Sequence, residues 1–286
     1  MDTIAYYDGA FGSPEELMVP FCDRTHFFGD GVYDATMGAN GHVVFVDEHL
    51  DRFFTSAAIF GINVPMDRAE LRNLLHDLLA RVEGPSHFVY WQVSRGIQMR
   101  AHTYDPAMPG KLAAYVTPEL MADPAEPLKL ITCEDKRFGY CQVKTLNLMP
   151  AVQYAQEAML AGAYEAVLVG ADGFVTECAH SNVCILKDGV LHTHPNDNHI
   201  LRGIAKTHLI QACYRESVPV LERAFTREEL MDADEVIVTS SSHLCTFANE
   251  VDGLPVGGRD QATLARVRDA VYAEYLDVCG LDALPC

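Results

Sequence analysis

Several features are scarce or absent in this 286-residue sequence, and they narrow the class of protein. No stretch approaches the roughly 18 consecutive apolar residues that a membrane-spanning helix needs, so we do not expect the chain to cross a bilayer. Basic residues are few. The chain has 21 Lys and Arg against 40 Asp and Glu. The resulting net charge of −19 argues against nucleic acid or an anionic membrane as a binding partner. The 49% hydrophobic content is enough for a substantial core.

Cysteines and histidines show no pattern of a disulfide framework or a metal site. The nine cysteines form no C-x-x-C pair, and their odd number without a signal peptide favours a reducing cytoplasm. His192, His194 and His199 lie close in sequence, but no carboxylate or thiolate in register completes a ligand set. Solvated histidines are the better interpretation, and we expect no metal.

Lysine is also scarce, and one of the six lysines stands beside an apolar run. Lys144 lies in the segment Val143-Lys144-Thr145-Leu146-Asn147-Leu148-Met149. Burial disfavours the ammonium form and lowers the pKa of a lysine, which supplies the neutral amine that attacks an aldehyde. On this pattern alone, a lysine at a strand end that extends its ammonium to water is the simpler interpretation. The neighbouring motifs favour a reactive, Schiff-base lysine instead.

Three later segments supply groups that would hold an anionic cofactor. Glu177 follows a short apolar strand and precedes small and polar residues. Gly203 precedes a helical pattern that starts at Ile204, and free amides at a helix N-terminus bind phosphate. The serines 240–242 end a predicted strand and add hydroxyl donors, although an ordinary polar loop would look the same. No glycine elbow marks these serines as a hydrolase nucleophile. An aldehyde-reactive lysine, an isolated carboxylate and a phosphate cradle are together the parts that hold pyridoxal phosphate.

With these groups in place, the sequence resembles a known family, the fold-type IV pyridoxal phosphate enzymes. The family includes branched-chain aminotransferases, D-amino acid aminotransferases and aminodeoxychorismate lyases. The resemblance covers nearly the whole chain, in ordered blocks at matching separations. These blocks are Phe28–Asp34, Asp47–Arg52, Lys144–Asn147, Thr176–Glu177, Ser181–Val183, Leu201–Ile204 and Thr239–Ser241.

The resemblance implies the catalytic and ring-binding roles. Lys144 would carry the Schiff base with the cofactor and move the proton at the substrate alpha carbon. Glu177 would accept a hydrogen bond from the pyridine nitrogen and keep it protonated, so that the ring can take up electrons.

The resemblance also implies the phosphate contacts. Arg52, on a helix predicted from Glu48 to Phe60, would contact phosphate oxygens with its planar fork. From the residues alone, a surface ion pair of Arg52 with Asp51 or Glu48 is the alternative. Ile204 and Ala205 would donate backbone amides, and Ser241 its hydroxyl. Ala205 stands where close relatives have threonine, so one side-chain contact is expected to be missing.

The stretch Ser94–His102 indicates which branch of the family the sequence resembles most. It looks like the R-G-x-x-x-R-x-H stretch of D-amino acid aminotransferases, where the second arginine and the histidine reach across a dimer interface. There, together with a tyrosine, they hold the substrate alpha-carboxylate. Carried over residue by residue, these are Arg100, His102 and Tyr33, which implies a homodimer with the site at its interface. Without the resemblance, a solvated basic turn is the alternative.

Three residues after Glu177 depart from the D-specific pattern. Cys178, Ala179 and His180 stand where close relatives carry small residues and serines. His180 brings a larger titratable group near the cofactor ring, where it would tune the pyridine side, narrow the substrate pocket or only fill space. These departures leave the substrate range open.

The periodicity predicts an α+β fold in two domains, with residues 1–117 as the first, 118–127 as a proline-containing linker and 128–286 as the cofactor-binding domain. A helix opening at Asp67, with Glu70 completing a capping box, would bury leucines at helical spacing. A strand is predicted from Val43 to Val46. The resemblance implies a small N-terminal α/β sandwich and a larger domain with a β pseudo-barrel and flanking helices, and the cofactor between them.

The sequence therefore predicts a cytoplasmic, pyridoxal-phosphate-dependent aminotransferase. A D-amino acid such as D-alanine would pass its amino group to a 2-oxo acid such as 2-oxoglutarate or pyruvate in a ping-pong cycle. The alternatives are a branched-chain L-amino acid aminotransferase, a 4-amino-4-deoxychorismate lyase and a non-catalytic carrier of the cofactor. The pair Arg100 and His102 counts against the lyase, and a carrier would have no use for Glu177.

Overall fold

The computed structural model describes residues 3–286, and the chain divides into two compact units. The first contains Met1–Met121, Val143–Asn147 and Leu276–Cys286, and the second contains Ala122–Gln142 and Leu148–Tyr275. Neither unit is a single stretch of chain. The short segment Val143–Asn147, which carries the candidate lysine, belongs to the first unit although its neighbours on both sides belong to the second.

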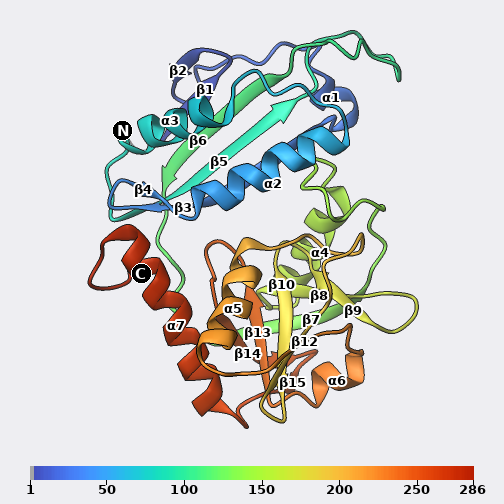
Figure 1. Ribbon diagram of the computed structural model, residues 1–286. Coiled ribbons are helices and arrows are strands. Elements are labelled where there is room, and N and C mark those ends of the chain that lie inside the picture. Colours follow the sequence, from blue (N-terminus) through green and yellow to red (C-terminus); the bar gives the residue numbers. More distant parts are fainter. Residues whose placement is uncertain (1–2) are drawn as a thin grey trace. The chain divides into compact units, whose positions relative to one another are not determined.

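The first unit is built on a six-stranded antiparallel sheet in the order β2-β1-β6-β5-β3-β4. Helices α2 and α3 lie across one face of this sheet (Figure 1). Trp91, Phe53 and Leu75 are fully buried in the core between the two layers. The elements are β1 (Ile4–Tyr7), β2 (Ala10–Gly12), α1 (Arg24–Phe28), β3 (Gly31–Ala39), β4 (His42–Val43), α2 (Val46–Ile59), α3 (Arg68–Leu79), β5 (Ser86–Ser94) and β6 (Lys111–Pro118).

Residues close by in the sequence determine where α2 and α3 begin. Asp67 caps α3 and forms a capping box with Glu70, as predicted, and the leucines on the same face of the helix are buried. The helix α2 starts at Val46, two residues earlier than predicted. The strand predicted over Val43–Val46 was wrong beyond Val43, because Phe45 takes a left-handed conformation with φ 49° and ends the extended backbone.

The second unit contains a mixed nine-stranded sheet in the order β12-β11-β10-β13-β14-β7-β8-β9, with β15 added to β14. Its strands curl rather than lie in one plane (Figure 1). Its core includes apolar side chains of β7, β8, β9, β10, β13 and β14, together with Phe225. The elements are β7 (Leu128–Glu134), α4 (Met149–Leu160), β8 (Glu165–Val169), β9 (Val175–Cys178), β10 (Asn182–Lys187), β11 (Val190–Thr193), α5 (Ile204–Arg215), β12 (Val220–Glu222), α6 (Arg227–Met231), β13 (Glu235–Thr239), β14 (Thr246–Val251), β15 (Leu254–Pro255) and α7 (Gln261–Cys279), whose last turn belongs to the first unit.

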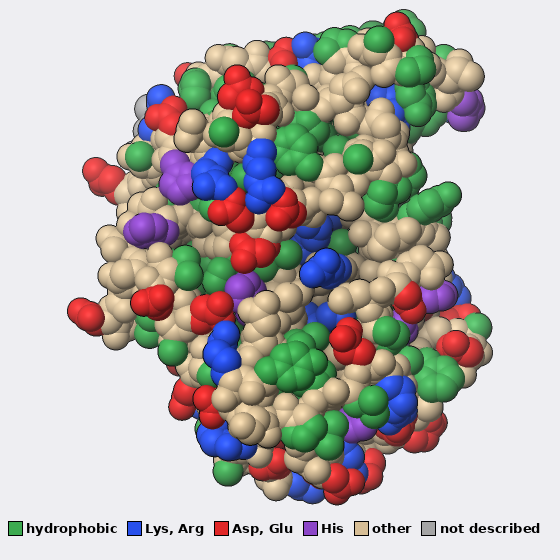
Figure 2. All heavy atoms as spheres, viewed as in Figure 1, with side chains coloured by type: hydrophobic (Ala, Val, Ile, Leu, Met, Phe, Trp, Pro, Cys, Tyr) green, Lys and Arg blue, Asp and Glu red, His purple; other side chains and the backbone are tan. Residues whose placement is uncertain are grey.

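The surface carries charged side chains of both signs. Figure 2 shows acidic and basic side chains interspersed over the visible face. Among residues 3–286, no helix is both long enough and apolar enough to span a membrane.

Candidate active site

Lys144 is held against β3 of the first unit. Its carbonyl accepts a hydrogen bond from Tyr33 N at 2.9 Å, and the next residue, Thr145, forms a bridge with Val32. The Lys144 side chain is half-buried, and its Nζ lies 4.5 Å from the centre of the Tyr33 ring. An ammonium over an aromatic face gains a favourable electrostatic contact. The structure therefore brings two of the predicted site residues, Lys144 and Tyr33, together.

Arg52 belongs to a buried charged cluster that the sequence did not reveal. Its Nε and Nη2 donate to both oxygens of Asp34, at 2.9 and 2.6 Å, and His49 Nδ1 lies 2.8 Å from Asp34 Oδ1. Burial alone would raise the pKa of the Asp34 carboxyl, but Arg52 and His49 outweigh it and hold that pKa well below its usual range. The surface pair with Asp51 or Glu48 considered above is not what the structure shows. The guanidinium is instead oriented from inside the unit by a two-pronged ion pair.

The pKa of His49 is lowered, first by burial and then by the nearby charges of Arg52 and Lys144, although Asp34 opposes the shift. His49 is therefore a neutral ring between an anion and two cations. It adds no positive charge to the surroundings of Lys144.

Arg100 and His102 lie on an exposed loop of the first unit and share one neighbour. The guanidinium carbon of Arg100 is 5.3 Å from the centre of the Phe28 ring, and the His102 ring is 5.4 Å from it. The loop is anchored by Arg24, which binds Asp30 through Nε at 2.7 Å and donates to the carbonyl of Ala101 at 2.8 Å. No contact of Arg100 or His102 with Tyr33 is present within the described chain.

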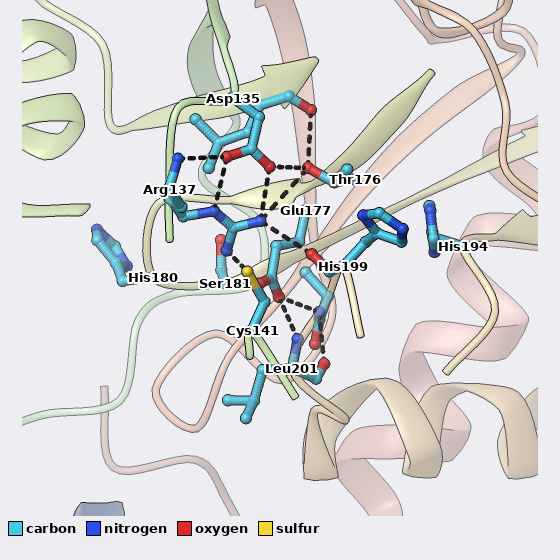
Figure 3. Close-up of polar contacts among 12 residues, drawn as sticks. Asp135, Arg137, Cys141, Thr176, Glu177, His180, Ser181, His194, His199 and Leu201 are labelled. Carbon is cyan, nitrogen blue, oxygen red and sulfur yellow. Dashed lines mark hydrogen bonds and ion pairs between the residues drawn. The ribbon is translucent and has the colours of Figure 1, made fainter. Parts of the chain in front are cut away.

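Glu177 lies in β9 of the second unit and is buried among hydrogen-bond donors (Figure 3). Its Oε2 accepts from Asn182 Nδ2 at 2.9 Å and from Leu201 N at 3.0 Å, and its Oε1 accepts from Arg137 Nη1. A carboxylate surrounded by donors is favoured in its ionised form. Glu177 is thus fixed in place as a negative charge.

Arg137 links Glu177 to a second carboxylate, Asp135. Arg137 was not identified from the sequence as a site residue. Its Nε and Nη2 donate to Asp135 at 3.0 and 2.9 Å, and Nη2 also donates to the His199 carbonyl at 3.0 Å. Burial alone would raise the pKa of Asp135, but Arg137 and the Thr176 hydroxyl lower it below its ordinary value. The only signal in the sequence was the basic pair Lys136-Arg137 in a loop, and such a pair is most often solvated.

A cavity of about 590 Å³ in the second unit reaches this network. Asp135, Arg137, Thr176, His194 and His199 are among the residues that line it. The two histidine rings lie 6.3 Å apart, and no group of three metal-ligating side chains occurs among residues 3–286.

The N-terminus of α5 is tied to the same network. Asn182 Nδ2 donates both to Glu177 and to the Leu201 carbonyl, at 2.9 and 3.1 Å. The N-cap of the helix is Gly203, so no side chain caps the amides of Ile204 and Ala205. A Cβ at Gly203 would clash with Asn182 Oδ1, so a larger residue there would displace the side chain that donates to Glu177. Ser241 lies in the turn after β13, in which Ser240 N donates to the His243 carbonyl at 2.8 Å.

The sequence matches the family "Amino-transferase class IV" over residues 31–251, which is more than half of the chain. The chain belongs to the class IV aminotransferases. This confirms the family expected from the motifs and the prediction of an aminotransferase.

Relatives of the chain include two D-alanine aminotransferases. It is 35% identical to that of Bacillus licheniformis over 253 residues, which cover 88% of this chain and 89% of that protein. It is 37% identical to that of Listeria monocytogenes serotype 1/2a (strain 10403S) over 272 residues, which cover 93% and 94%. Among solved structures, the branched-chain aminotransferase of Thermoproteus uzoniensis matches with a TM-score of 0.86, at 24% identity, over 98% of this chain and 95% of that one. This similarity confirms the fold-type IV, α+β architecture.

Proposed function

We propose that this class IV aminotransferase transfers the amino group of a D-amino acid, such as D-alanine, to a 2-oxo acid, such as 2-oxoglutarate or pyruvate, in a ping-pong reaction with pyridoxal phosphate as cofactor. The observation that carries the proposal is the 35–37% identity to D-alanine aminotransferases over about nine-tenths of the chain. The residues described above supply the chemistry that such a reaction needs.

Observations in each unit fit the cofactor. Pyridoxal phosphate, when bound, supplies an aldehyde that exchanges with amines and a ring that takes up electrons. The fixed, ionised Glu177 would accept a hydrogen bond from the ring nitrogen. The uncapped amides of Ile204 and Ala205, with the Ser241 hydroxyl, would donate to the phosphate, where negative charge is favoured by the helix N-terminus.

In the first unit, Arg52 would add a phosphate contact, because its Nε and Nη2 are bound to Asp34 and the whole guanidinium is oriented in advance. The Lys144 amine would anchor the cofactor. It would then move the proton from the substrate alpha carbon to the cofactor C4′ carbon, and in the opposite direction in the second half-reaction. The neutral His49 supports this role, because it does not add a third positive charge beside Lys144 and Arg52.

Tyr33, Arg100 and His102 would bind the substrate alpha-carboxylate. The exposed positions of Arg100 and His102, both beside Phe28, support the idea that they serve a partner copy in a homodimer. Exposed apolar side chains gather beside the same loop, where Gln98 N donates to the Cys22 carbonyl at 2.9 Å. These side chains are Met18, Phe21, Ile97 and Met99. Exposed apolar side chains that cluster together are typical of an interface.

We also infer a cytoplasmic location. All nine cysteines lie within the described residues, and all nine are free thiols. Thiols without disulfide partners are usual in a reducing compartment.

A single-turnover half-reaction tests the proposed function. Purified enzyme with bound cofactor is mixed separately with D-alanine, L-alanine, L-leucine and aminodeoxychorismate, and the visible absorbance of the bound cofactor is followed. We expect D-alanine to bleach the band and L-alanine to leave it unchanged. Bleaching by L-leucine alone would assign the enzyme to the branched-chain group, and pyruvate release from aminodeoxychorismate would make it a lyase.

A further inference from the structure

The turn between β9 and β10 carries a buried charge that the proposed cofactor contacts do not use. Glu165, in β8, is fully buried, and in the described part of the chain its ion pairs are limited to His180, whose Nδ1 lies 3.0 Å from Oε2. The same oxygen accepts hydrogen bonds from the Ser181 hydroxyl at 2.9 Å and from His180 N at 3.3 Å, and Oε1 accepts from Ala166 N at 2.9 Å. A buried carboxylate needs hydrogen-bond or ionic partners, and the His180 ring is the titratable partner in contact with it.

A second histidine in the cluster stays neutral. His243 Nδ1 lies 3.0 Å from the Tyr164 hydroxyl and 3.1 Å from the Ser242 hydroxyl. Burial, and then the charge of His180, lowers the pKa of His243 to about 4. The Tyr164 ring stands between the two histidines, 4.5 Å from the ring of His243 and 5.7 Å from that of His180. His180 is therefore the histidine of this pair that contacts the Glu165 carboxylate.

His180 is oriented from inside but reaches the surface of the unit. Its side chain is 47% exposed, whereas that of Glu165 is 0% exposed. Through Tyr164 and His243 it packs next to the turn that carries Ser241, and it follows Glu177 by three residues. Figure 3 draws its ring apart from the network of Arg137 and Glu177. An imidazole oriented by Glu165 thus packs next to the turn of Ser241, one of the groups proposed to bind the cofactor.

We propose that His180 is a specificity-determining residue, and that its Glu165-held imidazolium binds the side-chain carboxylate of dicarboxylic substrates, namely D-glutamate or D-aspartate as donor and 2-oxoglutarate as acceptor. This inference rests on the proposed D-amino acid transamination and names its preferred substrate class. A charge-assisted hydrogen bond to a carboxylate strengthens binding by about ten- to a hundredfold. Alanine and pyruvate have no side-chain carboxylate and gain nothing from it.

The test compares two donors in the half-reaction of the holoenzyme, so that no acceptor enters the measurement. The second-order rate constants for bleaching by D-glutamate and by D-alanine are measured for the wild type and for His180→Ser, and their ratio is the readout. We expect His180→Ser to lower the ratio at least tenfold. The control His42→Ser removes an exposed histidine of β4 and should leave the ratio at the wild-type value.

Two further variants separate charge from shape. His180→Gln keeps a neutral donor and should lower the ratio by less than His180→Ser. Glu165→Gln should also lower the ratio and should move the preference for D-glutamate to lower pH, because an adjacent carboxylate favours the imidazolium. A ratio within twofold of wild type in His180→Ser overturns this inference alone, provided that the wild type reacts with D-alanine. A wild type that does not react with D-alanine overturns the proposed function as well.

Discussion

Replacement of Arg137 by methionine tests whether the buried network around Glu177 holds the second unit together. Arg137 is 13% exposed, and its two carboxylate partners, Asp135 and Glu177, are 12% and 7% exposed. Methionine fills similar space without the charge, so both carboxylates lose their cation. Removing one partner of a buried ion pair costs about 3–5 kcal/mol. Because Glu177 keeps Asn182 and Leu201 N as donors, we expect a loss at the lower end of this range at pH 7.

The loss should depend on pH in a defined direction. In the wild type the pKa of Asp135 is lowered, so its ionised form stabilises the fold above the ordinary value of 3.8, and this contribution disappears as pH falls below that value. In Arg137→Met the burial that raises the pKa of Asp135 acts without its main opposing charge. Protonation then favours the folded variant, and its deficit in unfolding free energy should shrink as pH falls from 7 toward 4.

Urea unfolding of the cofactor-free proteins at pH 7 and at pH 4.5 measures both effects. Arg223→Met is the matched control, because Arg223 pairs with Glu229 at the surface, where both side chains are about 40% exposed. Such a pair contributes at most about 1 kcal/mol. The reasoning is refuted if Arg137→Met loses no more than the control, or if its loss is the same at both pH values.

Three further substitutions address the site directly. Lys144→Ala should abolish the half-reaction and the visible band of the bound cofactor while the fold remains, and turnover at the wild-type rate would remove Lys144 from the mechanism. Arg100→Ala should raise KM for both D-alanine and 2-oxoglutarate by about tenfold or more, as expected for a lost charge-assisted contact, and unchanged steady-state constants would contradict the clamp. Gly203→Ala should weaken cofactor binding, measured by titration, because its Cβ would clash with Asn182 Oδ1 and displace the side chain that donates to Glu177 and to the Leu201 carbonyl. Gly139→Ala, whose Cβ would meet no atom within 4 Å, is the control.

The elements most accurately predicted from sequence are those whose signals are local. The capping box of Asp67 and Glu70 and the buried leucine face of the helix that follows depend on residues within a few positions of one another, and the structure matches both. The early start of α2 depends on the left-handed backbone of Phe45, a conformation that a bulky residue seldom takes. The return of Val143–Asn147 to the first unit depends on hydrogen bonds to β3, more than 100 residues earlier in the chain. No local pattern encodes such a pairing.

The same distinction explains which charged residues were found. Lys144 and Glu177 were predicted because an isolated charge beside apolar residues is unusual in a sequence, and the family resemblance gave each a role. Asp34 and Arg137 were missed because a sequence cannot show whether a charge in a strand or loop is buried, and the solvated interpretation is the more common one. Asp34 orients the predicted site residue Arg52 through an ion pair between positions 18 residues apart. Arg137 orients the predicted Glu177 through an ion pair between positions 40 residues apart. A buried ion pair is poor evidence for net stability but fixes a side chain in one geometry. Asp34 and Arg137, which sequence reasoning missed, are therefore residues that hold the charged groups of the predicted site residues in a fixed orientation.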